Sequence, residues 1–166
     1  MCANICFAGI MDYNDDPDHQ KFLAAISQIE SSGGKNTNYP VITSGVSKGE
    51  RAVGNYGMTP DTLDTLNNNN RTAHTFGPDQ NIADQLDNNE LGDFMKNNPR
   101  VDDNYAKQNA NKLFKKARGD DDQAAAMWNK GYSVKPDQLD PDALDQNGYV
   151  QKFRKLKQML GNKYAE

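Results

Sequence analysis

The sequence predicts a mainly α-helical single domain with at most a small β-hairpin. Apolar residues recur at three- and four-residue spacing in several segments, as they do along one face of a helix. Prolines, capping side chains and glycines bound those segments. The length of 166 residues suits one domain, and only residues 39–43, Y-P-V-I-T, resemble a strand.

The first expected helix begins at Pro17 and ends near residue 30. Asp16 before Pro17 is a favourable start, because aspartate caps a first turn and proline is tolerated within it. Two serines and two glycines at residues 31–34 end the pattern. The residues that share its apolar face are Phe22, Leu23, Ile26 and Ile29.

The rest of the chain predicts further helices separated by polar segments. Residues 33–57 are polar and rich in glycine, so we expect either a loop or a short hairpin there. The further helices are expected over residues 59–66, ended by the asparagines at 67–70; from residues 78–81 onward; over 105–117; over 120–128; and after Gly148.

Composition excludes several classes of function. The net charge of −4 gives no overall basic field, so no nucleic-acid partner is expected. Mean hydropathy is −0.93, and no run approaches the roughly 20 apolar residues of a membrane span. The first residues lack a basic leader, which argues against a secretory signal.

No metal or other cofactor is expected. Cys2 and Cys6 are the only cysteines, and no second cysteine or histidine pair completes a zinc site. The basic residues of the last helix favour a solvated face, with a surface role against an anionic polymer left open. These residues are Lys152, Arg154, Lys155, Lys157 and Lys163.

Glu30 is the candidate catalytic residue. It falls in the last turn of the first helix, where unpaired carbonyls disfavour an ionised carboxylate, and apolar neighbours would raise its pKa further. A carboxylic acid that stays protonated near neutral pH can act as the general acid in glycosidic-bond cleavage. From this segment alone, a solvated glutamate at a helix end is the favoured alternative.

Five segments occur in an order that matches a known family. They are I-E-S-S-G-G at residues 29–34, A-V-G-N-Y-G-M-T-P-D-T at 52–62, G-P-D-Q-N-I at 77–82, A-A-A-M-W-N-K-G at 124–131 and G-Y-V-Q-K-F at 148–153. Together they resemble the soluble, SLT-type lysozyme-like lytic transglycosylases, and the loop segments are most similar to phage virion-associated wall-degrading domains. Each motif is weak alone, and their shared order carries the resemblance.

The resemblance implies an α+β lysozyme-like fold that cleaves the MurNAc-GlcNAc β-1,4 bond of peptidoglycan glycan strands. Glu30 would protonate the leaving oxygen and then, as a base, deprotonate the sugar's own 6-hydroxyl, giving a 1,6-anhydro product without a cofactor. Tyr149 would place its hydroxyl near Glu30, and the alternative is a core tyrosine. The positions expected to contact substrate are Ser31, Tyr56, Gly57, Asn129 and Tyr149.

The chain also departs from the family pattern. Gly57 occupies the place of a glutamine that normally lines the cleft, and a polar insertion lies around residues 83–109. We therefore divide the chain into an N-terminal extension, 1–16, the transglycosylase-like domain, 17–161, and a C-terminal tail, 162–166.

Two other functions stay open. A second carboxylate from Glu50, Asp61 or Asp64 would make the protein a lysozyme-type hydrolase, although Asp61 and Asp64 suit the first turn of a helix. The other alternative is a non-catalytic structural virion module. The resemblance implies a phage virion protein that acts at the bacterial cell wall, with other virion proteins as further partners, and holin-dependent release from the host cell stays open as the other route.

Overall fold

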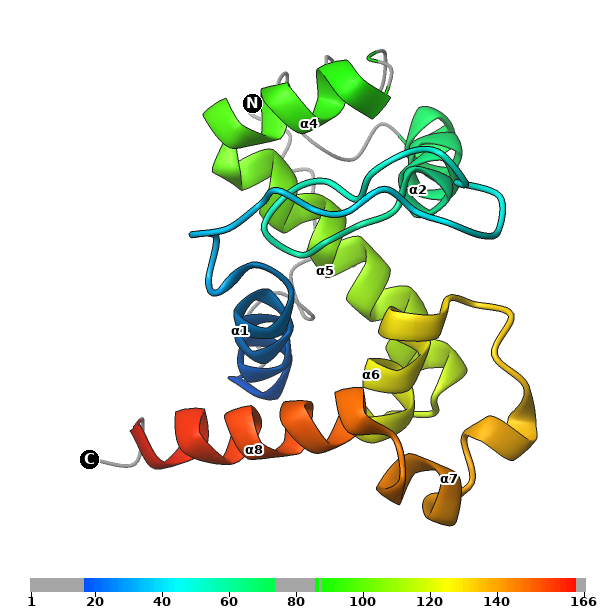
Figure 1. The fold of residues 1–166 in the computed structure, drawn as a ribbon. Coiled ribbons are helices and arrows are strands. Elements are labelled where there is room, and N and C mark those ends of the chain that lie inside the picture. Colours follow the sequence, from blue (N-terminus) through cyan, green and yellow to red (C-terminus); the bar gives the residue numbers. More distant parts are fainter. Residues whose placement is uncertain (1–16, 74–85, 87, 164–166) are drawn as a thin grey trace, which may run out of the picture.

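Helix α5, Pro99–Lys116, runs through the centre of the molecule, and four of the other described helices pack against it (Figure 1). The structure is a computed structural model that describes residues 17–73, 86 and 88–163. The described residues form a mostly helical single domain, as predicted. Their β-structure consists of two isolated antiparallel bridges, Val41 with Arg51 and Val53 with Met58.

From α4 onward the described helices follow one another with short connections, whereas a long loop at residues 32–59 crosses from α1 to α2 (Figure 1). In addition to α5 they are α1, Pro17–Ser31; α2, Pro60–Ala73; α4, Asn88–Asn97; α6, Asp121–Lys130; the 3-10 turn η2, Pro136–Gln138; α7, Pro141–Asp145; and α8, Gly148–Lys163.

Local sequence explains where these helices begin and end. Helix α1 ends at Ser31 because the following residues turn into the left-handed region, with φ of 69° at Gly33. Pro99 occupies the first turn of α5, where its missing N–H costs nothing. Asp120 caps α6 by accepting a 2.9 Å hydrogen bond from the Gln123 N–H.

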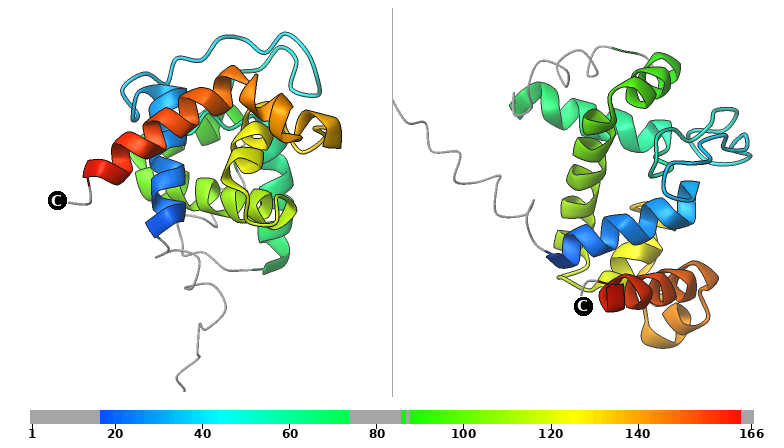
Figure 2. Two further views of the ribbon diagram at one scale, coloured as in Figure 1. Left: turned by 90° about the horizontal axis from the view of Figure 1, so that it is seen from below. Right: turned by 90° about the vertical axis from the view of Figure 1, so that its left-hand side faces the viewer.

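Four aromatic rings form the part of the core that joins α1, α5, α6 and α8. Phe22 of α1 is fully buried, and its ring centroid lies 4.8 Å from Phe114 and 5.2 Å from Phe153. Trp128 completes the group at 6.0 Å from Phe22. Edge-on contacts of this kind favour a defined packing. These ring contacts hold α1 and α8 against each other, and the two helices lie next to each other in both further views (Figure 2).

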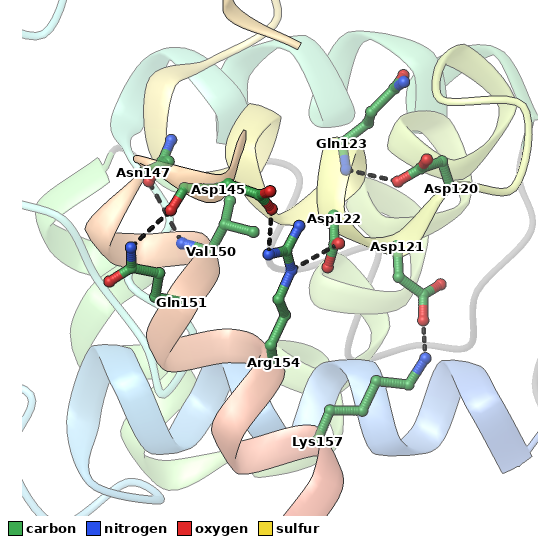
Figure 3. Close-up of polar contacts among 10 residues, drawn as sticks. All are labelled: Asp120, Asp121, Asp122, Gln123, Asp145, Asn147, Val150, Gln151, Arg154 and Lys157. Atoms are coloured by element: carbon green, nitrogen blue, oxygen red, sulfur yellow. Dashed lines mark hydrogen bonds and ion pairs between the residues drawn. The ribbon is translucent and has the colours of Figure 1, made fainter. Parts of the chain in front are cut away.

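Ion pairs and hydrogen bonds fasten α8 to α6 and α7 (Figure 3). Arg154 donates to Asp122 at 2.8 Å and to Asp145 at 2.6 Å, and Lys157 pairs with Asp121. Two of the basic residues expected on a solvated face are thus engaged with neighbouring helices. The start of α8 is fixed separately, because Asn147 Oδ1 accepts the N–H groups of Tyr149 and Val150.

The structure corrects several expected boundaries. Helix α2 continues through the asparagines at 67–70, since asparagine costs a helix only a fraction of a kcal/mol and neither proline nor glycine intervenes. The described part of the predicted insertion, 83–109, forms α4 and the first half of α5, and it supplies core residues. Helix α8 also extends two residues beyond the expected domain end at 161.

Some predictions lie outside the described residues. These are the extension at 1–16 with Cys2 and Cys6, and the segment G-P-D-Q-N-I at 77–82 with the helix expected to begin there. Among the described helices, none is both long and apolar enough to cross a bilayer.

Candidate active site

Glu30 and Tyr149 meet although 119 residues separate them in the chain. Glu30 lies in the last turn of α1 and Tyr149 in the first turn of α8. The Tyr149 hydroxyl donates a 2.6 Å hydrogen bond to Glu30 Oε1. The packing of α1 on α8 and the Asn147 cap of α8 together determine where this hydroxyl stands. The structure thus brings together the predicted catalytic residue and one of its predicted neighbours.

Burial governs the ionisation of this pair. It raises the pKa of Glu30 above its ordinary value of 4.5, and the hydrogen bond from Tyr149 partly offsets that rise because it stabilises the carboxylate. Burial also raises the pKa of Tyr149, and the adjacent Glu30 charge raises it further. Tyr149 therefore stays a neutral hydrogen-bond donor, whereas Glu30 holds its proton to higher pH than an exposed glutamate would.

Gly57 lies directly against the Glu30 carboxylate. A Cβ atom built on Gly57 would come 2.6 Å from Glu30 Oε2 and 3.3 Å from Glu30 Cβ. The backbone φ of 62° is also one that residues with side chains rarely adopt. With Glu30 in this position, there is no room for the glutamine that the family pattern places at residue 57. Gly57 shapes the site by its lack of a side chain.

The turn at residues 54–57 is anchored by hydrogen bonds from three directions. The Tyr39 hydroxyl donates to Gly54 O at 2.7 Å, and Trp128 Nε1 donates to Tyr56 O at 3.1 Å. Ser31 donates to Asn55 O at 2.6 Å. Helices α1 and α6 therefore both hold the turn that meets Glu30.

Ser31 belongs to the fold more than to an open binding surface. Its side chain is 1% exposed, and its Oγ contacts Asn55 O and Ser27 O and accepts the Gly34 N–H at 2.8 Å. The predicted substrate contact at Ser31 stays a prediction, and in the structure the hydroxyl joins the end of α1 to the loop. Substrate could reach it only if this loop moved.

Tyr56 and Asn129 occupy different environments. The Tyr56 ring packs against the core, and its hydroxyl donates to Asp103 Oδ1 at 2.7 Å, so its polar end is already engaged. Asn129 is exposed near the end of α6, next to Trp128. Of the predicted substrate contacts, Asn129 is thus the one whose side chain is open to solvent.

Sequence reasoning missed Tyr39 and Asp102. Asp102 is 2% exposed, and its Oδ2 accepts the Asn55 N–H at 2.6 Å. The Asp102 pKa is raised to about 7. Burial is the main cause and the charge of Asp103 adds to it, while the Asn55 hydrogen bond partly offsets the rise. A signal was present: Asp102 lies on the same helical stripe as Tyr105, Ala106 and Asn109, all of them buried.

The other candidate acids are exposed, and Glu30 lines neither of two pockets in the described residues. The candidate second carboxylates Glu50, Asp61 and Asp64 are all exposed. One pocket of about 270 Å³ lies between the loop and α4, where Tyr39, Arg51 and Lys96 help to line it, and another of about 400 Å³ lies among α1, α6 and α8. Within the described ranges, no group of three or more histidine, cysteine or acidic side chains could hold a metal ion.

Comparisons with protein-family models, with curated proteins and with solved structures find no match to this chain. A function for the chain is therefore argued from the Glu30 site itself.

Proposed function

We propose that the protein is a peptidoglycan lytic transglycosylase that uses Glu30 as its single catalytic carboxylate. One observation carries the proposal: a half-buried glutamate at the end of a helix has a raised pKa and accepts a hydrogen bond from Tyr149. A carboxyl group with a raised pKa can donate a proton near neutral pH and take one back afterwards. The ordered motifs shared with the SLT-type enzymes agree with this role.

The reaction needs two proton transfers and no water. The Glu30 carboxyl first protonates the bridging oxygen as the bond between that oxygen and C1 of the MurNAc residue breaks. The carboxylate, held by Tyr149, then accepts the proton of the MurNAc 6-hydroxyl while O6 bonds to C1. The products are a 1,6-anhydro end and a free 4-hydroxyl, so Glu30 ends in the protonated form in which it began.

The placement of the other acids supports this route over hydrolysis. A hydrolase needs a second carboxylate that faces the scissile bond and either activates water or attacks the sugar. Glu50, Asp61 and Asp64 are exposed, and the buried Asp102 lies beneath Gly54, where a side chain would collide with it. Glu30 is therefore the acid of the described chain best suited to the chemistry.

Wall clearing by three proteins tests the proposal. We expect wild type to clear purified cell walls, Glu30→Gln to lose at least about 100-fold in rate, and Glu50→Gln, an exposed loop glutamate, to match wild type. Mass spectrometry of the fragments should find ends lighter by one water than hydrolysis products. Clearing that survives in Glu30→Gln would refute the catalytic role, and hydrated ends would indicate a hydrolase.

The proposed setting is a phage particle that opens the host wall locally during genome delivery. This setting follows from the family resemblance, and other virion proteins would be its neighbours. Mass spectrometry of purified particles should detect the protein in a fixed number of copies. Its absence from particles that still infect would move the protein to another stage of infection.

A further inference from the structure

Asp102 is the buried acid that the proposed mechanism leaves unused. It lies in the first turns of α5, and its only short polar contact to the loop is the 2.6 Å bond from the Asn55 N–H to Oδ2. Its other oxygen, Oδ1, is buried without a hydrogen-bond partner among the described residues. A Cβ on Gly54 would lie 2.4 Å from that oxygen. The loop backbone thus rests directly on this carboxyl group.

A short path of contacts leads from Asp102 to Glu30. Asp102 holds the N–H of Asn55, and two residues later Gly57 lies against Glu30 Oε2. The next peptide group of the loop is held by α1, because Asn55 O accepts the Ser31 hydroxyl at 2.6 Å. Ser31 is the residue next to Glu30. The Asn55 backbone is therefore fixed between Asp102 and the end of the helix that carries Glu30.

We propose that Asp102 is a positioning residue that holds residues 54–57 against Glu30 and thereby determines where the Glu30 carboxyl group stands. The expected effect of Asp102 on catalysis rests on the proposed function. Its expected effect on the position and pKa of the Glu30 carboxyl group does not. Burying a polar group is unfavourable unless it is hydrogen-bonded, and the Asn55 N–H supplies that bond to Oδ2.

The charged and titratable groups around Asp102 are few. Asp103, its neighbour on α5, raises the pKa of Asp102, and the Asn55 N–H lowers it. From the loop, the Tyr39 and Tyr56 hydroxyls face the same region, and the Asp102 charge raises the pKa of both. Tyr39 is also close enough to Glu30 for the Glu30 charge to raise the Tyr39 pKa, after the larger effect of burial.

Amide NMR tests the contact without any assay of activity. The Asn55 amide resonance of the full chain should move with a single midpoint near pH 7, following the Asp102 carboxyl that it contacts. Asp102→Asn should abolish that titration. The matched control Asp103→Asn should keep it and move its midpoint to lower pH, because a repelling charge is removed. An Asn55 amide that does not titrate in wild type would overturn the proposal.

The Glu30 carboxyl titration, followed by carbon NMR, tests positioning. Asp102→Asn keeps an acceptor for Asn55 and should leave the Glu30 pKa close to that of wild type. Asp102→Ala removes the acceptor, so residues 54–57 should move and the Glu30 pKa should fall toward its ordinary value of 4.5 as water reaches it. Asp102→Leu, which fills the space without an acceptor, serves if the alanine variant does not fold. An unchanged Glu30 pKa in a folded alanine or leucine variant would also overturn the proposal.

Wall clearing then separates positioning from stability. If Asp102 acts through Glu30, the alanine or leucine variant should lose about 100-fold in kcat with little change in KM, since an error near 1 Å in a reacting group has that order of effect. Asp102→Asn should recover most of the rate. A wild type that clears no walls would refute the proposed function, while the two titrations would still decide the role of Asp102.

Discussion

Replacing Gly57 by alanine should destabilise the protein and displace Glu30. The backbone φ of 62° costs an alanine about 1–2 kcal/mol. The new Cβ would lie 2.6 Å from Glu30 Oε2, closer than the 3.0 Å below which such contacts essentially do not occur. Glu30 must therefore move, which weakens its hydrogen bond with Tyr149, a contact to an ionisable group worth about 1.5–3 kcal/mol. We expect a total loss of about 3 kcal/mol.

Gly45 provides the matched control for this substitution. Its φ is 83°, and a Cβ there would meet nothing within 4 Å, so Gly45→Ala carries the backbone cost alone. Urea unfolding should find Gly57→Ala about 1–2 kcal/mol less stable than Gly45→Ala. In a Glu30→Ala background most of this difference should disappear, since the carboxylate is gone and only the 3.3 Å contact with Cβ remains. Equal costs in the wild-type background would refute the reasoning, because the contact with Glu30 would then carry no energy.

Four further predictions concern the site and the core. Because the fold raises the pKa of Glu30, ionisation of Glu30 destabilises the folded protein as pH rises above 4.5. The Tm of Glu30→Gln minus that of wild type should therefore increase from acid to neutral pH, and a constant difference would contradict this. Tyr149→Phe should raise the Glu30 pKa further in a carbon NMR titration, and no change would mean that the hydroxyl does not stabilise the carboxylate. Phe22→Ala should cost about 3–5 kcal/mol in urea unfolding, and a cost under about 1 kcal/mol would place this ring outside the core. Arg154→Ala should cost less than about 1 kcal/mol, and that cost should vanish in high salt, because its side chain is 40% exposed.

Strong local patterns made the helices predictable. The apolar stripe of α1, with Pro17 before it and glycines after it, placed both ends of that helix to within about one residue. The aspartates at the start of α6 placed its beginning to within about one residue, whereas its end at Lys130 lies two residues beyond the expected one. Glu30 was singled out because its position in the last turn follows directly from the periodicity of α1.

Residues 83–109 show what the pattern could not supply. Comparison with the family pattern marks this stretch as a polar insertion, and α4 and α5 bury Leu91, Met95 and Tyr105 within it. A helix with few apolar residues is stabilised by tertiary packing, which no local signal records. The burial of Asp102 follows from its helical stripe, but its contact does not, because its partner Asn55 lies 47 residues away. The contact between Gly57 and Glu30 is equally non-local. The sequence shows that the family's glutamine is missing at residue 57, but only the structure shows that Glu30 leaves no room for it.

The hydrogen bond between Glu30 and Tyr149 joins the first described helix to the last. During synthesis Glu30 emerges early, but its partner emerges only after another 119 residues have been added. At about 5–20 residues per second, that interval lasts about 6–24 s. A nascent or truncated chain that stops before α8 thus contains the candidate acid without the hydroxyl that stabilises its ionised form, and the complete pair first exists when nearly the whole domain has been made.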